Sequence, residues 1–321
     1  MGGAPASTNE LLIDGAPNIG SAGAVAYNPP MDAVTEVKAE SFQADAAYGH
    51  TGGGTVNVLL KSGTNQFHGS LYEYNQNTAL AATSWFLNAS GQRKTVSQYN
   101  QWGATAGGPV FAPKLFDGRN KLFFFFGYEG VRNGLPRPQA ATVPTEAERS
   151  GDFSALLKIG PQYQIYDPSS GTVQGSRIQR TPIQGNRIPA TSINPISQKL
   201  MQYLPLPNNF VAPDGINDYL SNQVEMNKFY SMLTRVDLNL NDRNKIYFNI
   251  RHNLRTVSLD LFHNEGTNYF QQRINWGGQV EDVITLSPTT VWSIRANYTR
   301  YALPTITGSD GYDITQLGFP Q

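Results

Sequence analysis

Residues 290–302 read TVWSIRANYTRYA, and apolar and polar side chains alternate along the whole stretch. The two sets differ in parity: the even-numbered residues are Trp292, Ile294, Ala296 and Tyr298, and the odd-numbered ones are Ser293, Arg295, Asn297 and Thr299. Successive side chains of a β-strand point to opposite faces, so a repeat of two residues predicts a strand with one apolar and one polar face. A helix would repeat its apolar residues every three to four positions.

Six further segments read as strands, and they are 66–77, 97–109, 120–133, 228–241, 245–257 and 275–286. Around residues 242–244 the apolar face is again even-numbered, with Leu238 and Leu240 before the turn and Ile246 and Phe248 after it. The chain holds 31 Gly, 16 Tyr and 16 Phe, and only 15% of its residues are charged. Aromatic residues suit a pleated surface and glycine suits turns, so the composition favours strands.

The connections between these segments are alternately long and short, at about 20, 10, 95, 3, 18 and 3 residues. In an up-and-down barrel of an outer membrane, long loops lie outside the cell and short turns face the periplasm. We therefore predict an all-β fold: an antiparallel transmembrane β-barrel, partial and with about seven strands, whose first strand runs outward. The proline-rich segment 134–227 is expected to be an extracellular loop, with a short helix in Ser192–Tyr203 and a short strand at Tyr163–Asp167.

Parity also predicts the register of the two tight hairpins, because directly opposed residues point to the same face. The expected pairs are Leu240–Ile246, Leu286–Thr290 and Ile284–Trp292. The first pair leaves a three-residue loop, Asp242–Asn244, whose last residue is expected to be left-handed.

Composition excludes several classes of protein. Lys and Arg together number 24, as do Asp and Glu, so no basic surface for nucleic acid is expected. The absence of cysteine excludes thiolate metal sites, disulfides and cysteine nucleophiles. No run of 18 apolar residues predicts a transmembrane helix. The opening Met1–Pro5 lacks the form of a signal peptide, and we expect the chain to be a fragment of a longer protein.

No motif supports an enzyme. Gly52-Gly53-Gly54 is not a Walker loop, because Lys61 follows Leu60 and not a glycine. Lys61-Ser62-Gly63 has the order of a penicillin-recognising element, but no serine precedes a lysine by three positions. Residues 237–248 lack the Gly and Glu of a calcium loop, and the four histidines show no metal-ligand spacing. We therefore predict no catalytic, cofactor-binding or metal-binding residue and no cofactor.

The most specific pattern is an ordered set of residues that follows Asp32–Lys38. Its members are Tyr48, Gly49, Gly52, Gly53, Gly54, Lys61, Ser62, Gly63, Thr64, Asn65, His68 and Gly69. This order resembles the end of the plug and the entry into the barrel of TonB-dependent receptors, in particular the Oar-like outer-membrane proteins. The earlier Leu12–Pro17 and the later Arg235-Val236-Asp237 are similar to the same family.

The resemblance implies that residues 1–65 are the C-terminal part of a plug domain and residues 66–321 the N-terminal part of the barrel. Short strands are expected at Val34–Ala39 and Thr55–Lys61, joined by the glycine-rich turn. The family implies a location in the cell outer membrane of a Gram-negative bacterium. It also implies import of a scarce solute, with outer-membrane lipid, the TonB energy-coupling complex and an unidentified solute as partners.

Two alternatives remain open. One is a non-transporting surface or adhesion barrel in the same membrane. The other is a soluble β-rich carbohydrate-binding module, which would not alternate long and short connections.

Overall fold

The computed structural model describes residues 9–20, 23–40, 53–83, 85, 88, 97–209, 212–264, 266 and 268–320. These form two compact units. The sheet unit comprises Met1–Leu135, Met226–Ser258 and Gln271–Thr305, and the loop unit comprises Pro136–Glu225, Leu259–Phe270 and Ile306–Gln321.

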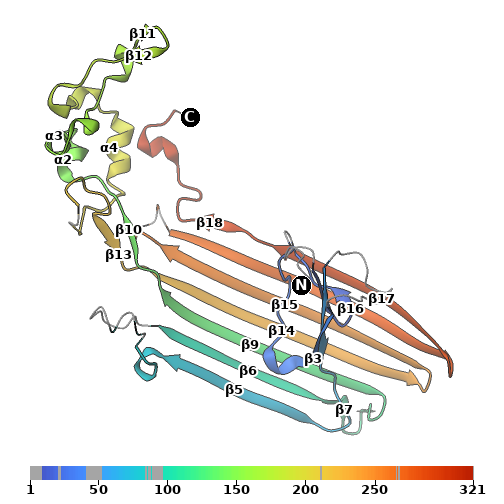
Figure 1. Ribbon diagram of the computed structural model, residues 1–321. Coiled ribbons are helices and arrows are strands. Elements are labelled where there is room, and N and C mark those ends of the chain that lie inside the picture. The colour runs from blue at the N-terminus through green and yellow to red at the C-terminus, as the bar shows by residue number, and fades with distance from the viewer. Residues whose placement is uncertain are drawn as a thin grey trace. The chain divides into compact units, whose positions relative to one another are not determined.

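A large antiparallel sheet dominates the sheet unit, with strand order β17-β16-β15-β14-β9-β6-β5 (Figure 1). Its strands are β5 (His68–Asn77), β6 (Gln98–Pro109), β9 (Leu122–Pro136), β14 (Val224–Asn241), β15 (Asn244–Asp260), β16 (Asn268–Ser287) and β17 (Thr290–Ala302). A short β18 (Thr305–Thr307) also pairs with β16. All seven strands expected from the alternation are therefore confirmed, although β16 begins seven positions before the expected residue 275.

The connections at the two ends of the large sheet differ. Segments 78–97, 137–223 and 261–267 join strands at one end, and the first includes the 3-10 turn η4 (Thr78–Leu80). At the other end lie two-residue turns and segment 110–121, which folds into the hairpin β7 (Phe111–Ala112) and β8 (Phe116–Asp117). This arrangement is the expected alternation of long and short connections.

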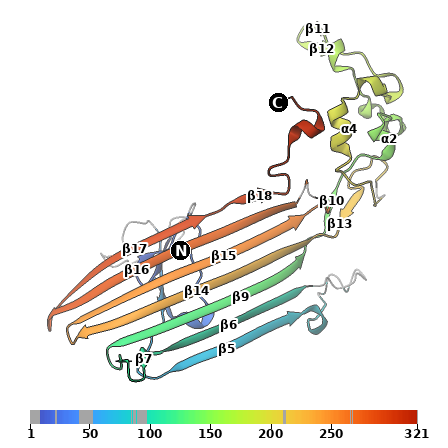
Figure 2. The same ribbon diagram turned by 180° about the vertical axis from the view of Figure 1, so that it is seen from behind.

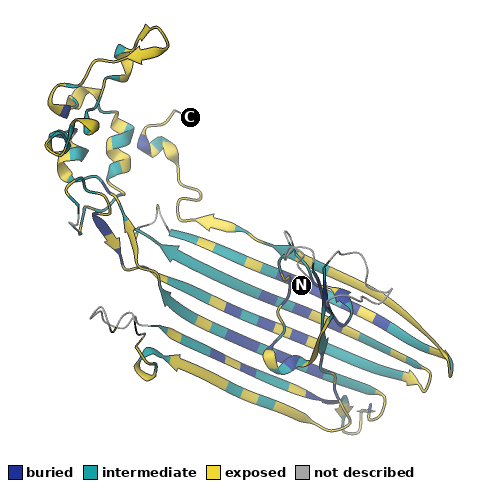
Figure 3. Ribbon diagram, in the orientation of Figure 1, coloured by how far each residue is buried: buried dark blue, intermediate teal, exposed yellow. Residues whose placement is uncertain are grey.

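The two faces of the large sheet differ as the parity predicted (Figure 3). On the inner face, the odd-numbered Ser231, Asn249 and Arg251 are fully buried. On the outer face, the even-numbered Phe248 and Ile294 are 44% and 49% exposed. Polar residues are thus buried and apolar residues exposed, which is the reverse of a soluble sheet and is typical of a barrel whose outer face contacts lipid.

The register of the first hairpin differs from the expectation by two positions along its strands, and that of the second differs only at the turn. Leu238 pairs with Ile246 and Asn241 with Asn244, so Leu240 lies in a β-bulge and the turn has two residues. The expected pair Leu240–Ile246 and the expected three-residue loop Asp242–Asn244 are therefore wrong, and Asn244 does not have the expected left-handed φ. In the second hairpin, Ile284–Trp292 is confirmed, but Ser287 pairs with Thr290 and Leu286 lies in the bulge. Because the shift in the first hairpin is by two positions, and side chains alternate with a period of two, the face assignment of the strand bodies is unaffected.

A smaller, N-terminal sheet lies against the inner face of the large sheet (Figures 1 and 2). Its strands, in the order β2-β1-β4-β3, are β1 (Glu10–Ile13), β2 (Ala16–Pro17), β3 (Val34–Glu40) and β4 (Thr55–Leu60). Asp14 and Gly15 form the β1–β2 turn with φ values of 46° and 72°, a geometry that Asp-Gly adopts readily. The 3-10 turn η3 (Met31–Ala33) leads into β3. The strands expected at Val34–Ala39 and Thr55–Lys61 are thus confirmed.

One apolar cluster joins the two sheets. Its members are Ile13, Tyr27, Ala33 and Leu60 from the N-terminal segment and Phe125 and Leu233 from β9 and β14. Burial of such side chains stabilises the contact by about 25 cal/mol for each Å² of apolar surface removed from water.

The loop unit is folded rather than extended. Its elements are β10 (Gln139–Ala141), α2 (Glu146–Arg149), α3 (Ser154–Leu157), η5 (Pro161–Tyr163), η6 (Pro168–Ser170), β11 (Thr172–Gln174), β12 (Arg177–Gln179), η7 (Gln184–Asn186), η8 (Ala190–Ser192), α4 (Pro195–Met201), β13 (Tyr219–Ser221) and η9 (Ile314–Leu317). The short helix expected in Ser192–Tyr203 is confirmed as α4. The strand expected at Tyr163–Asp167 is wrong: only Tyr166 forms a bridge, to Pro182. Among the described residues, no helix has the length and apolar character needed to cross a membrane.

Candidate functional site

The segment between β4 and β5 carries the chain from one sheet to the other. Lys61 N–H donates to the Ala33 carbonyl at 2.8 Å, which extends the β3–β4 contact by one residue. Gly63 then passes so close to the large sheet that a Cβ there would lie 2.2 Å from the Phe124 carbonyl oxygen and 2.9 Å from that of Gly108. Only glycine fits at such a distance from backbone. The exposed Ser62 forms no side-chain hydrogen bond with the described residues.

Thr64, Asn65 and His68 fix the start of β5. The Asn65 side chain accepts from Asn120 N–H at 2.6 Å and also donates to the Asn120 side chain. His68 Nδ1 lies 2.9 Å from the Gln66 carbonyl, and the Thr64 hydroxyl donates to the same carbonyl at 3.1 Å. A Cβ on Gly69 would lie 2.4 Å from the Thr105 carbonyl oxygen, so this position also requires glycine. These residues therefore position the chain at the entry into the large sheet.

The glycine-rich turn is described only in part. Tyr48, Gly49 and Gly52 lie outside the described residues. Gly54 joins the turn to β1: its carbonyl accepts from Glu10 N–H at 2.9 Å, and its N–H donates to the Asn9 side chain at 3.1 Å. Gly53 precedes it and is half-buried.

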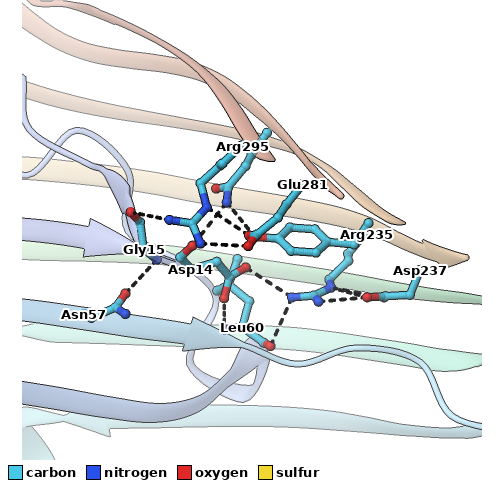
Figure 4. Close-up of polar contacts among 10 residues, drawn as sticks. Asp14, Gly15, Asn57, Leu60, Arg235, Asp237, Glu281 and Arg295 are labelled. Carbon is cyan, nitrogen blue, oxygen red and sulfur yellow. Dashed lines mark hydrogen bonds and ion pairs between the residues drawn. The ribbon is translucent and has the colours of Figure 1, made fainter. Parts of the chain in front are cut away.

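A buried ion pair connects the N-terminal sheet to β14 (Figure 4). Arg235 Nη1 lies 3.1 Å from Asp14 Oδ2, and its Nη2 lies 2.8 Å from Asp237 Oδ1. The guanidinium also stacks over the Tyr247 ring, with its carbon 4.2 Å from the ring centroid. Leu60 N–H donates to Asp14 Oδ1 at 2.9 Å. One guanidinium therefore serves two carboxylates, one from each sheet.

A second ion pair lies beside the first, between β16 and β17. Arg295 contacts Glu281 through two nitrogens at 2.9 Å and donates its third, Nη1, to the Gly15 carbonyl at 2.9 Å. Tyr247 donates its hydroxyl to Glu281 at 2.8 Å. The Gln279 amide donates to the Asp14 carbonyl at 3.2 Å. The turn at Asp14-Gly15 is therefore held by side chains of three strands of the large sheet, β14, β16 and β17. We name Asp14, Arg235, Asp237, Glu281 and Arg295 the interface cluster.

Burial affects the ionisation of the interface cluster. Burial raises the pKa of Asp14 above its ordinary 3.8, although the Leu60 N–H and the Arg235 guanidinium favour the charged form. Several inner-face groups are also buried without hydrogen-bond partners among the described residues, and they include Nε and Nη1 of Arg251 and the amide of Asn249. Such groups regain solvation when water reaches them, which offsets part of the free energy lost when the two sheets separate.

The sequence pattern singles out the junction residues but does not indicate the interface cluster. Arg235 and Asp237 were assigned to the polar face of their strand, and Asp14 lay in a stretch similar to the receptor family. The sequence shows Arg235 and Asp237 on one face of a strand and Asp14 in a separate turn, and it does not show that these residues meet. No group of three potential metal ligands occurs in the part of the chain that the structure describes.

Comparison with known proteins adds the following. A family model described as "Outer membrane beta barrel domain" matches residues 59–321. The TonB-dependent transporter Oar from Myxococcus xanthus is 29% identical over 85 residues, which are 25% of this chain and 7% of Oar. The outer membrane transporter YddB from Escherichia coli shares the fold, with a TM-score of 0.56 and 9% identity over 95% of this chain and 33% of that chain. The ferric-catecholate import receptor Fiu from E. coli K12, in its open form, gives a TM-score of 0.41 at 11% identity, over 92% of this chain and 42% of Fiu. The chain thus spans about a third of the length of YddB.

Proposed function

Because this chain belongs to the outer membrane beta barrel domain family, we propose that it is part of a TonB-dependent receptor that imports a scarce solute through a plugged barrel. The protein lies in the outer membrane of a Gram-negative bacterium. In this proposal residues 1–65 are the C-terminal part of the plug domain and residues 66–321 the N-terminal part of the barrel. Segment 134–227 is an extracellular loop, and the chain carries no catalytic residue.

The observation that carries the proposal is the N-terminal sheet on the inner face of the large sheet, with charged groups across the contact. A plug that must move needs contacts that water can replace. Hydrogen bonds and ion pairs such as Arg295 to Gly15 meet this need, because water offers equivalent partners to both groups once they separate. The buried but unpaired atoms of Arg251 and Asn249 favour separation further.

The partners of the proposed receptor are inferred from the two faces of the large sheet and from the resemblance to TonB-dependent receptors. The exposed apolar side chains of the outer face, such as Phe248 and Ile294, would contact membrane lipid. Energy would come from the TonB complex across the periplasm. The solute would bind on the side of the plug that faces the cell exterior.

A solute-depletion experiment tests the proposal. Cells with and without the full-length protein are grown in a defined medium, and the solutes left in the medium are compared by mass spectrometry, with and without a protonophore. We expect at least one solute to be depleted only when both the protein and the proton-motive force are present. Depletion that is the same in all four cultures would contradict transport.

A reversible tether tests plug movement directly. The chain has no cysteine, and Ser70 Oγ lies 2.6 Å from Asp32 Oδ2 across the two sheets. In the Asp32→Cys/Ser70→Cys variant, oxidation should stop depletion and reduction should restore it. The matched control is Val173→Cys/Ile178→Cys, because these residues are directly opposed within one exposed hairpin. Oxidation of the control should leave depletion unchanged.

The folded loop unit favours a second candidate, a surface barrel that binds other cells or envelope components. Its buried Asn186 forms hydrogen bonds to three neighbouring residues, so the unit presents a defined surface. If no solute is depleted but deletion of residues 140–220 abolishes attachment of cells to a surface, this candidate replaces transport.

A further inference from the structure

A cavity of about 420 Å³ lies between the N-terminal segment and the inner face of the large sheet. Its lining includes Gly23–Ala26, Asn28, Phe229, Asn253, Arg255, Arg273 and Tyr301. A second cavity of about 340 Å³ shares Asn28, Phe229 and Arg255 with the first. Cavities that bind small molecules measure about 300–1,000 Å³, so the space suits a small organic solute.

Two arginines on neighbouring strands give this cavity its charge. Arg255 lies on β15 and Arg273 on β16, and both belong to the odd-numbered, inner-facing set. Within the part of the chain that the structure describes, neither guanidinium forms a hydrogen bond or an ion pair. By contrast, Arg235 and Arg295 on the same face each contact a carboxylate. Arg255 and Arg273 both line the same cavity. Arg255 is half-buried and Arg273 is exposed, so both guanidiniums are free to bind an anionic group that enters the cavity.

The acidic residue that lines the second cavity already has partners. Glu129 lines the second cavity, but its Oε2 accepts from the Tyr72 hydroxyl at 2.7 Å and from Met31 N–H at 2.9 Å. The rest of the cavity lining includes aromatic rings and amide side chains. The Arg255 guanidinium lies 5.1 Å from the Phe229 ring centroid, and Asn253 is buried with no side-chain hydrogen bond to the described residues. The cavity thus combines two cations with apolar rings and a free amide.

We propose that this cavity binds a small organic solute that carries two acidic groups on an apolar body, with Arg255 and Arg273 as the recognising cations. The proposal deepens the transport function, on which it rests, by naming the chemical class of the solute. Each guanidinium presents a planar set of N–H donors that matches a carboxylate. Phe229 and Tyr301 contact the apolar body, and Asn253 offers a further hydrogen bond.

Binding of isophthalate, an aromatic dicarboxylate, to the purified full-length protein tests this proposal. Isothermal titration should show saturable binding that weakens as salt is added, since the attraction is between charges. Isophthalamide has the same shape without charge and should not bind. Inorganic phosphate should bind more weakly, because it lacks the ring. Equal binding of the diacid and the diamide, or of the diacid and phosphate, overturns the proposal.

Four variants assign the effect to the two residues. Arg255→Gln and Arg273→Gln should each weaken isophthalate binding by about tenfold or more, because each removes one charge-assisted contact. Arg273→Lys keeps the charge and should retain part of the affinity, which shows that the fold is intact. Arg177→Gln, in the exposed hairpin of the loop unit, should bind as the wild type does. Unchanged binding in both Gln variants overturns the assignment. Titration needs no energy source, so its result stands whatever solute depletion shows about transport.

Discussion

Asp14 and Arg235 are separated by 221 positions in the chain, and their side chains meet at 3.1 Å between Oδ2 and Nη1. The guanidinium is held from its other side by Asp237 and lies over the Tyr247 ring. Its orientation is therefore set by the large sheet, and the N-terminal sheet supplies the second carboxylate. The contact can form only when the β1–β2 turn reaches the inner face, so it reports whether the N-terminal sheet is in place.

Removal of Arg235 should loosen the N-terminal sheet. Arg235→Ala leaves the buried Asp14 and the half-buried Asp237 carboxylates without their cation, and loss of one partner of a buried ion pair costs about 3–5 kcal/mol. We expect faster hydrogen exchange in β1–β4 and faster proteolysis of residues 9–60, while the large sheet stays protected. Arg119→Ala is the control, because its pair with Asp117 is exposed. Equal exchange in the two variants would show that the ion pair does not hold the sheet.

The ionisation of Asp14 predicts a pH dependence. Burial raises the pKa of Asp14, so the folded protein binds this proton more tightly than the unfolded chain. The stability that this proton contributes is greatest below pH 3.8, which is the pKa of the carboxyl in the unfolded chain. It is lost as the pH rises through the raised pKa of the folded protein. Asp14→Asn keeps the acceptor for Leu60 N–H but does not titrate. In urea denaturation between about pH 4 and 7, the free energy of unfolding of the variant should therefore fall less with rising pH than that of the wild type.

Asp117→Asn is the control for this experiment. Hydrogen bonds from Arg119 lower the pKa of Asp117 to about 2. Any stability from this group is present above its unfolded value and is lost only as the pH falls toward 2, outside the range measured. A pH dependence that is the same in the wild type and in Asp14→Asn would exclude Asp14 as its source.

The strands and their faces could be predicted from the sequence because each is decided by local alternation. Most polar residues of 228–257 fall on the buried inner face and most apolar ones on the exposed outer face, as the parity requires, and the exceptions include the buried Phe229 and Leu233. The ends of the hairpins could not be predicted in this way. Leu240 and Leu286 lie in β-bulges next to the turns. The alternation of apolar and polar residues does not predict where a strand contains such an extra residue.

The interface cluster depends on contacts between sheets, which alternation does not specify. The pattern placed Arg235 on the inner face but carried no information on its partner from the N-terminal sheet. Gly63 and Gly69 illustrate a different limit. Their order in the chain was similar to that of a known family, but the reason for glycine is the distance to the carbonyls of Phe124 and Thr105. That distance follows only from the packed structure.

A charge on the outer face should impair insertion into a bilayer. Ile250 lies on the outer face of β15 and is 46% exposed. Lysine at a lipid-facing position costs about 2–4 kcal/mol at the membrane midplane and less near the interfaces. Ile250→Lys should therefore lower the yield of folded protein in lipid vesicles. Ile178→Lys is the control, since Ile178 is 62% exposed in the hairpin of the loop unit. A yield of folded protein equal to that of the control would show that Ile250 does not face lipid.

Gly63 should not tolerate a side chain. Gly63→Ala places a Cβ against two backbone carbonyls, and backbone cannot yield as a flexible side chain does. The chain would have to move away from Phe124, which disrupts the crossing between the sheets. We expect a reduced folded fraction and increased proteolysis at residues 61–67. At Gly266 a Cβ would meet only ordinary contacts, at 3.4 Å or more, so Gly266→Ala should fold normally. Normal folding of both variants would contradict the close approach.

Asn186 should determine the stability of the loop unit. Its side chain is fully buried, accepts from Ile165 N–H at 2.9 Å and donates to the Tyr163 carbonyl at 2.7 Å. Asn186→Ala leaves these groups unpaired, at a cost of about 1–3 kcal/mol for each. Because segment 134–227 is proposed to lie outside the cell, protease added to intact cells should cut the variant there faster than the wild type.

Backbone strain must be separated from the lost hydrogen bonds, because Asn186 has a φ of 54° and alanine is strained there. Asn217 provides the match: its φ is 60°, it is exposed, and its side chain forms no hydrogen bond with the described residues. Asn217→Ala introduces the same backbone strain without the loss of buried hydrogen bonds. If the two variants are cut at the same rate, strain alone explains the effect. Faster cutting of Asn186→Ala measures what the buried amide contributes to the loop unit.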